Sequence, residues 1–543
     1  METVSIVLFL LLAVVVSGAV SRMLPVSVPT PLVQILLGAV IGLSSSHRVS
    51  LDPELFLFLF LPPLLFLDGW RIPKDELFKD IGTVFELALG LVLLTVIGMG
   101  FFIHWMIPAM PLTVAFALAA VVSPTDPIAV SAIAARVPIP KRMMHILEGE
   151  SLLNDASGLV CLRFAIAAAL TGSFSAGEAA LNFLWVAGAG LFIGVATTLC
   201  ITRAKAAVTK RWGEDTGSQI LVSLLIPFAS YILAEHVHAS GILAAVGAGL
   251  TMTYAEISRQ TLAVTRMRRN SVWDTIQFTL NGIIFVLLGE QLPAIVQGAK
   301  STVALTGHVS PWWLAVYVVA IVAGLVALRF SWVWLSLRLT ILRQAPRGGG
   351  MTSPSWRLVA ATSFAGVRGA ITLAGVLTLP LAMTDGTPFP ARDLAIFLAA
   401  GVIVLSLIIA SLTLPVLLRN LTMPPEPSRQ AEEDSSRIAT ATAAIQAIER
   451  HQHVLAERHG EADIYVTAGG SVMDRYRERI EGLRGKQTEE MTTGHVLMRE
   501  FALVGLQAER SALAALVRSR KITSAVAQKM TRELDLAEAR YRG

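Results

Sequence analysis

Charge and cysteine are both scarce in this sequence. Asp, Glu, Lys and Arg make up 15% of its 543 residues, whereas hydrophobic residues make up 54%. This small share of charge excludes a set of soluble domains. The two cysteines, Cys161 and Cys200, both lie in apolar runs, which excludes a disulfide framework and a cysteine-ligated zinc site. What remains is the composition of an all-α polytopic membrane protein.

Long apolar runs fill the first four-fifths of the chain. Windows of about 20 apolar residues, the length needed to cross the hydrocarbon of a bilayer, predict thirteen transmembrane helices in a domain of residues 1–419. The predicted helices lie near 3–21, 28–45, 51–69, 81–107, 111–135, 144–171, 178–203, 217–236, 239–258, 272–297, 312–341, 356–382 and 391–418. Membrane lipid is therefore the expected surrounding of this domain.

Lysine and arginine are distributed unevenly between successive loops. One set of alternate loops carries basic clusters, for example Lys210 and Arg211, while the loops between them carry only Arg48, Lys300 and Arg392. Because basic loops stay on the cytoplasmic side, we predict a multi-pass protein of the cell membrane with its N-terminus outside and its C-terminus in the cytoplasm. The same bias accounts for the net charge of +5, so no nucleic-acid partner is expected.

The composition changes abruptly near residue 420, where the sequence becomes rich in Ala, Glu and Arg. Residues 420–543 are predicted to form a cytoplasmic helical tail that is broken at Gly469-Gly470 and at Gly485. The predicted tail helices are about 431–458, 472–484, 494–519 and 522–541. We expect an accessory or regulatory domain that binds a partner or ligand; a purely stabilising tail is the alternative.

Residues 148–158 place carboxylates, an amide and hydroxyls inside an apolar span. At about 100° per residue, Glu150, Ser151, Asn154 and Asp155 fall on one helical face roughly 140° wide, and Gly158 near its middle leaves room for a backbone or a ligand. A charged side chain in hydrocarbon costs about 2.5–3.5 kcal/mol, so an intramembrane carboxylate indicates a functional site. A capping sequence at a helix start is the alternative, but the apolar pattern continues on both sides.

Two prolines interrupt the fifth predicted span. Ser-Pro-Thr-Asp-Pro at 123–127 deprives the carbonyls of Ala120 and Ser123 of their helical donors. Non-helical backbone at membrane depth is tolerated only where protein or a water-filled cavity satisfies it. With Thr125 and Asp126, these carbonyls form the oxygen-rich surround that a small alkali cation prefers. A simple proline kink is the alternative.

The twelfth predicted span carries a second interruption, at 363–370. Gly366 and Gly369 permit unwinding or close packing, and Arg368 lies at mid-membrane, where it needs a buried partner. Glu150 is the first candidate for that partner and Asp126 the second. The two broken spans, five and twelve, are seven spans apart. This is the spacing expected if spans 1–6 and 8–13 are inverted repeats, an architecture that binds substrate where the broken helices meet.

Other ionisable residues in the spans carry weaker signals. Asp68, at the end of the third span, belongs either to the site or to the membrane interface. Glu86, Glu235 and Glu290 lie near span ends and are expected to reach the interface. Arg163 has no assigned role.

Three polar motifs now stand in order on the chain: Ser-Pro-Thr-Asp-Pro at 123–127, Gly-Glu-Ser-Leu-Leu-Asn-Asp at 149–155 and Gly-Val-Arg-Gly-Ala at 366–370. Together they resemble the Na⁺/H⁺ exchangers of the monovalent cation–proton antiporter-1 branch, which includes bacterial NhaP-like and animal exchangers. The resemblance covers about residues 3–418 and leaves out the tail.

The resemblance implies a homodimer of thirteen-span protomers, each with a dimerisation domain and a six-helix core domain. It also implies that Asp155 is the carboxylate that binds the ion and the proton, with Asn154 and Ser151 beside it. Na⁺ is then expected at Asp155, Thr125 and Ser151, with Asp126 in the same broken-helix site.

The same resemblance implies that Glu150 pairs with Arg368, and Asp68 stands where the family often has an acid. An Asn-Asp pair at 154–155, in place of two aspartates, resembles the electroneutral branch. The expected activity is secondary antiport of cytoplasmic Na⁺ or Li⁺ against external H⁺ in a 1:1 ratio, by alternating access and without a cofactor.

Other functions fit parts of the sequence. A K⁺/H⁺ antiporter on the same scaffold is the nearest alternative, because a sequence predicts which groups line a cavity better than it predicts the size of the cavity. A gated cation channel fits less well, since a buried carboxylate–arginine pair suits occlusion more than conduction. A membrane enzyme would need a catalytic constellation, and the sequence contains no phosphate loop, no metal-spaced His/Cys set and no clear Ser-His-Asp arrangement.

Overall fold

A computed structural model of the protein describes most of the chain. The described residues are 2–23, 28–44, 53–72, 74, 81–127, 130–131, 141–172, 176–257, 263–305, 310, 312–344, 356–383, 385–419, 429–459, 462–484, 489–519, 522 and 524–542. Within these ranges the regular secondary structure is helical, apart from one isolated β-bridge between Ala382 and Pro388. The prediction of an all-α fold is confirmed.

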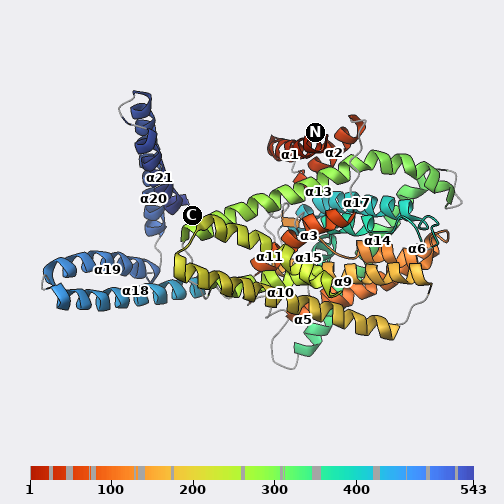
Figure 1. The fold of residues 1–543 in the computed structure, drawn as a ribbon, viewed down its shortest axis with the longest axis horizontal. Coiled ribbons are helices and arrows are strands. Elements are labelled where there is room, and N and C mark those ends of the chain that lie inside the picture. The colour runs from red at the N-terminus through yellow and green to blue at the C-terminus, as the bar shows by residue number, and fades with distance from the viewer. Residues whose placement is uncertain are drawn as a thin grey trace. The chain divides into compact units, whose positions relative to one another are not determined.

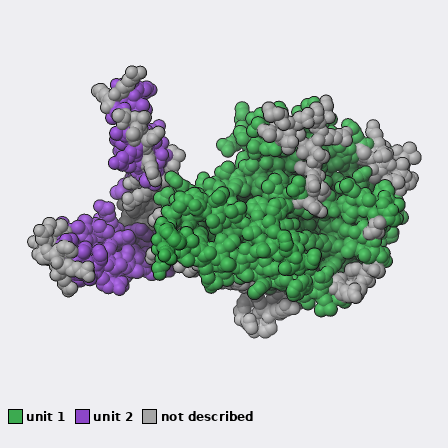
Figure 2. Space-filling model, viewed as in Figure 1, with its two compact units in different colours: residues 1–422 green, residues 423–543 purple. Residues whose placement is uncertain are grey.

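Residues 1–422 form one compact unit and residues 423–543 form another (Figure 2). The helices of the first unit are α1 (Glu2–Met23), α2 (Thr30–Ser44), α3 (Pro53–Arg71), α5 (Ile81–Phe85), the π-helix η1 (Glu86–Leu91), α6 (Val92–Met106), α7 (Leu112–Val122), α9 (Lys141–Thr171), α10 (Ala176–Trp212), α11 (Thr216–His236), α12 (Gly241–Ile257), α13 (Ala263–Leu305), α14 (Trp312–Gln344), α15 (Trp356–Phe364), α16 (Ala370–Leu377) and α17 (Arg392–Leu418). Seven helices of the described chain are long and apolar enough to span a membrane, and shorter apolar helices accompany them. They support the predicted multi-pass membrane protein, while the count of thirteen spans and the inverted repeats stay predictions.

The first unit, whose helices are labelled in Figure 1, contains two groups of helices that pack mainly among themselves. The first bundle comprises α1, α2, α3, α10, α11, α12 and α13. The second bundle comprises α5, η1, α6, α7, α9, α14, α15, α16 and α17. The two bundles meet chiefly where α13 packs on α17, with smaller contacts of α3 on α9 and α16.

Glycine lets helices of the first bundle approach very closely. A Cβ atom on Gly38 of α2 would lie 2.0 Å from the Val286 carbonyl oxygen of α13, and one on Gly289 of α13 would lie 2.0 Å from the Ile35 oxygen. Lipid supplies no hydrophobic driving force between helices, so small residues that permit tight packing hold them together. The α2–α13 pair is therefore fixed by the sequence at these glycines.

Two helices of the second bundle are interrupted where the sequence predicts interruptions. The helix α7 ends at Val122, directly before the motif at 123–127, and residues 365–369 separate α15 from α16. Much of the second half of the span predicted at 111–135 lies outside the described residues. A third irregularity, η1, was not predicted, and its Glu86 accepts a hydrogen bond of 2.6 Å from the Ser336 hydroxyl on α14 rather than only reaching the interface.

The second unit contains α18 (Arg429–His459), α19 (Ala462–Arg484), α20 (Glu489–Arg518) and α21 (Ser524–Arg542). The helix α18 packs along α19, and α20 packs along α21. The break predicted at Gly469-Gly470 was wrong, because both glycines lie inside α19. A Cβ atom on Gly469 would lie 2.7 Å from the Gln452 side-chain oxygen of α18, so close packing outweighs the cost of about 1 kcal/mol that each helical glycine carries.

Candidate functional site

The polar face predicted on α9 is buried within the protein. Glu150 and Asn154 are each 1% exposed, and Asp155 is 4% exposed. Gly158 provides the room expected of it, because a Cβ atom there would lie 2.4 Å from the ring of Pro124. The interrupted segment after α7 therefore lies directly on the polar face of α9.

The two interruptions meet and satisfy each other's backbone. The Asp126 N–H donates to the Val367 carbonyl at 2.7 Å, and the Arg368 Nε donates to the Val122 carbonyl at 2.8 Å. Arg368 also donates to the Gly366 carbonyl. Broken backbone inside a membrane must be satisfied by protein or by a water-filled cavity, and these bonds satisfy the carbonyls of Val122, Gly366 and Val367. Gly369 makes the approach possible, since a Cβ atom there would overlap the Asp126 carboxylate.

Glu150 has a different partner from the one predicted from the sequence. Arg329 of α14 donates to both oxygens of Glu150, at 2.6 Å for the Nη2–Oε2 bond, and both side chains are about 2% exposed or less. Arg368 instead donates to backbone carbonyls that the broken helices leave without helical partners. The Glu150–Arg368 pair is thus replaced by Glu150–Arg329, a buried bidentate ion pair of the stronger kind.

Thr125 connects this ion pair to α9. Its hydroxyl donates to Glu150 Oε1 at 3.3 Å and accepts from the Asn154 amide nitrogen at 2.9 Å. The Asn154 oxygen is buried and accepts no hydrogen bond from any described residue. Asn154 therefore fixes the broken segment in place.

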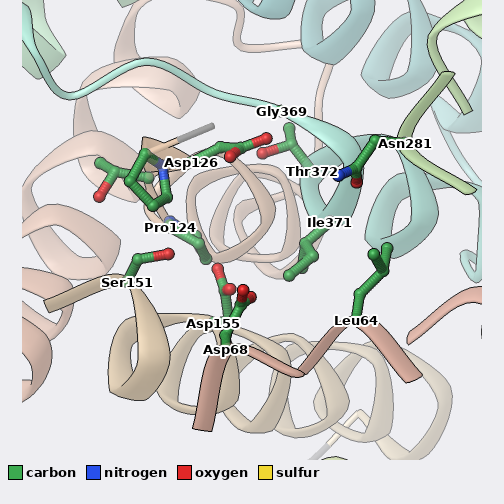
Figure 3. A pocket seen from close by; sticks show the side chains of 12 residues that line it. Leu64, Asp68, Pro124, Asp126, Ser151, Asp155, Asn281, Gly369, Ile371 and Thr372 are labelled. Atoms are coloured by element: carbon green, nitrogen blue, oxygen red, sulfur yellow. The ribbon is translucent and has the colours of Figure 1, made fainter. Parts of the chain in front are cut away.

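A small cavity lies between the two interruptions, α9 and the first bundle (Figure 3). It is lined by Leu64, Asp68, Pro124, Thr125, Asp126, Pro127, Ser151, Asp155, Asn281, Gly369, Ile371 and Thr372. Its volume is about 20 Å³, counted as the space open to the centre of a water molecule. A cavity needs about 10–15 Å³ on this measure to hold one water molecule, so it has room for one water or one small ion.

The cavity wall is rich in oxygen and carries no basic side chain from the described part of the chain. Asp68, Asp126 and Asp155 all contribute to it, so Asp68 lies on the cavity rather than only at the interface. Ser151 and Thr125 add hydroxyls, whereas Asn154 is not on the wall. Hard cations prefer such oxygen ligands.

Three features of the site were missed from the sequence. Arg329 lies near the middle of the apolar span predicted at 312–341, and the cost of a charge in hydrocarbon that marked Arg368 also applies to it. Asn281 of α13 lines the cavity. Arg163 of α9, left without a role, forms a half-exposed ion pair of 3.0 Å with Glu235 of α11, and no spacing in the sequence indicates this contact.

The fold and the site together define the class of protein. Paired broken helices around a small cavity lined by carboxylates are typical of secondary ion transporters. Residues 8–420 match the family described as "Sodium/hydrogen exchanger, transmembrane". The chain belongs to this family of cation/proton antiporters, and it is therefore a transporter and not an enzyme.

Individual relatives agree with the family. The chain is 41% identical to "Uncharacterized Na(+)/H(+) exchanger YjcE" of Escherichia coli, over 99% of both chains. It is 37% identical to the "Sodium, potassium, lithium and rubidium/H(+) antiporter" of Bacillus subtilis, over 99% of this chain and 78% of that one. The structure of the sodium proton antiporter MjNhaP1 from Methanocaldococcus jannaschii shares the fold, with a TM-score of 0.54 and 19% identity over 78% of this chain and 99% of that chain.

Proposed function

We propose that this chain exchanges cytoplasmic Na⁺, or Li⁺, for external H⁺ at one shared site on Asp155, which binds either ion but never both. The observation that carries the proposal is the place of Asp155. Its carboxylate is 4% exposed, opens on the cavity and forms no ion pair with a described residue. A buried charge of this kind is costly until a cation or a proton neutralises it, so the two ions compete for it.

The proposed Na⁺ ligands are Asp155, Ser151 and Thr125, because all three line the cavity. Asp126 and Asp68 line it as well. Three carboxylates around one small cavity repel one another when all are ionised, which favours occupation by a cation or by protons. Asp68 enters from the first bundle, whereas the other four residues belong to the second bundle.

Alternating access follows from this division between bundles. The second bundle, with most of the cavity wall, moves against the first when the site is neutralised by H⁺ or Na⁺. An empty, charged site resists crossing the apolar barrier, because a charge in hydrocarbon is unfavourable. The proton gradient drives the exchange without ATP or a cofactor, and the Asn154-Asp155 pair supports a 1:1 electroneutral ratio.

K⁺ is a second candidate substrate. The Bacillus subtilis relative, 37% identical to this chain, is named a sodium, potassium, lithium and rubidium/H⁺ antiporter. The same oxygen-lined cavity accommodates K⁺ if its walls separate slightly, so K⁺/H⁺ exchange is the alternative activity.

The working form that we propose is a homodimer in the cell membrane, with the N-terminus outside and the tail in the cytoplasm. The basic loops support this orientation. The helical unit 423–543 is proposed as a regulatory domain for a partner or ligand, and transport by a chain truncated near residue 425 tests it. If the truncated chain transports at the same rate as the full chain at every pH, the tail has no regulatory role.

Proton flux in proteoliposomes of the purified chain tests the function. An imposed pH gradient is challenged with Na⁺, Li⁺ or K⁺, with and without a voltage clamp set by an ionophore. We expect Na⁺ and Li⁺ to collapse the gradient equally with and without the clamp. Dependence on voltage would contradict the 1:1 ratio, and no flux with any cation in folded protein would contradict the exchange itself.

A further inference from the structure

Asn281 is a buried amide that the exchange mechanism above does not use. It lies on α13, is 8% exposed and lines the cavity. Its side-chain oxygen is buried and accepts no hydrogen bond from any described residue. Buried polar atoms are nearly always hydrogen-bonded, so an exception in a cavity wall points to an oxygen that is available to a ligand entering the cavity.

The position of Asn281 in the cavity is distinctive. Most of the wall comes from the second bundle, and only Leu64, Asp68 and Asn281 come from the first bundle. Leu64 is apolar, so the first bundle offers two oxygen-bearing side chains to the cavity, one charged and one neutral. Figure 3 places them on different sides of the cavity, with Asp68 beside Asp155 and Asn281 beyond Thr372.

An amide has the right chemistry for a neutral ligand. Its oxygen has two lone pairs, and rotation about the terminal side-chain bond exchanges the places of oxygen and nitrogen. The number and field strength of neutral carbonyl dipoles around an alkali cation influence the choice between Na⁺ and K⁺. A larger cation takes more oxygen ligands than a smaller one.

We propose that Asn281 is a specificity-determining residue, whose amide oxygen completes the oxygen shell of the cation bound at Asp155 from the α13 side. This inference rests on the proposed function. Asn281 belongs to the first bundle and Asp155 to the second. The oxygen shell is therefore complete only while the two bundles keep their present positions relative to each other. The cation thereby loses one ligand when the second bundle moves.

The test compares cation dependence of proton flux in proteoliposomes of the full chain. Asn281→Leu keeps the size of the side chain but removes its oxygen, and Asn281→Ser restores an oxygen on a shorter side chain. The control is Asn270→Leu, the same change at an exposed position on the same helix. Flux is measured against Na⁺, Li⁺ and K⁺ concentration, so that KM and the maximal rate are obtained separately for each variant.

We expect Asn281→Leu to raise the KM for Na⁺ about tenfold, the effect of losing one ligand contact, with a smaller change in maximal rate. The KM of any larger cation that is transported should rise more than that of Na⁺, and Asn281→Ser should recover part of the loss. A merely structural residue would lower the maximal rate and leave the ranking of cations unchanged.

Two outcomes would overturn the inference: a KM for Na⁺ within twofold of the wild-type value in Asn281→Leu, or the same rise in Asn270→Leu. If Asn281→Leu does not fold, Asn281→Ala decides, since it also removes the oxygen, and an unchanged KM and cation ranking in that variant would contradict a ligand role. Failure of the proposed function is separate, because the wild-type chain itself would then show no cation-dependent flux.

Discussion

The Asp155→Asn variant is expected to reduce cation-dependent proton flux to that of protein-free liposomes. The amide has nearly the shape of the carboxylate, but it neither takes up a proton in this pH range nor offers a charge to a cation. Asp155 lies on the cavity wall without an ion-pair partner among the described residues. Its neutralisation therefore removes the event that couples the two ions.

The protein should remain folded in this variant. Burying a neutral amide in place of an unpaired charge removes a desolvation cost, so the unfolding temperature in detergent should equal or exceed the wild-type value. The matched control is Asp393→Asn at the start of α17, where the side chain is 82% exposed. Robust Na⁺-dependent flux in Asp155→Asn, at a level near that of the control, would remove Asp155 from the central role.

The sequence predicted the parts of this site that violate local rules. Prolines at 124 and 127 and glycines at 366 and 369 disrupt helices by their own backbone chemistry. The carboxylates of α9 are recognisable because they are expensive in hydrocarbon. Each signal is contained in a few consecutive residues, so the interruptions and the polar face lie where they were expected.

The partner of Glu150 could not be predicted in the same way. Arg329 and Arg368 both lie inside apolar spans, and the sequence of each span does not show that Arg329 is the one that reaches Glu150. Arg368 is occupied by the carbonyls of Val122 and Gly366. Local sequence specifies that a charge needs a partner, whereas the choice of partner depends on contacts between distant helices.

The tail illustrates the opposite error. Gly469-Gly470 carries a strong local signal for a break, yet α19 continues through it because Gly469 packs against Gln452 of α18. Tertiary contact overrides propensity when the propensity is worth only about 1 kcal/mol per glycine.

The Arg329→Leu variant is expected to lose about 3–5 kcal/mol of stability, the typical effect of removing one partner of a buried ion pair. Glu150 would then be left charged and 1% exposed, and the weak hydrogen bond of 3.3 Å from Thr125 would be its remaining hydrogen bond from a described side chain. The measurement is the unfolding temperature in detergent, with transport as a second readout. Arg338→Leu is the control, because Arg338 lies on the same helix with its side chain exposed.

The double variant Glu150→Leu/Arg329→Leu separates the charge pair from the packing of Arg329. Replacing a whole buried ion pair by apolar residues is often neutral or stabilising by about 1–4 kcal/mol, so the double variant should be more stable than Arg329→Leu alone. Glu150→Leu should not rescue Arg368→Leu in the same way, because Arg368 binds backbone carbonyls and not Glu150. Two double-mutant cycles, one for each pair, give the two coupling energies, and a larger coupling of Glu150 to Arg368 than to Arg329 would restore the pairing first predicted from the sequence.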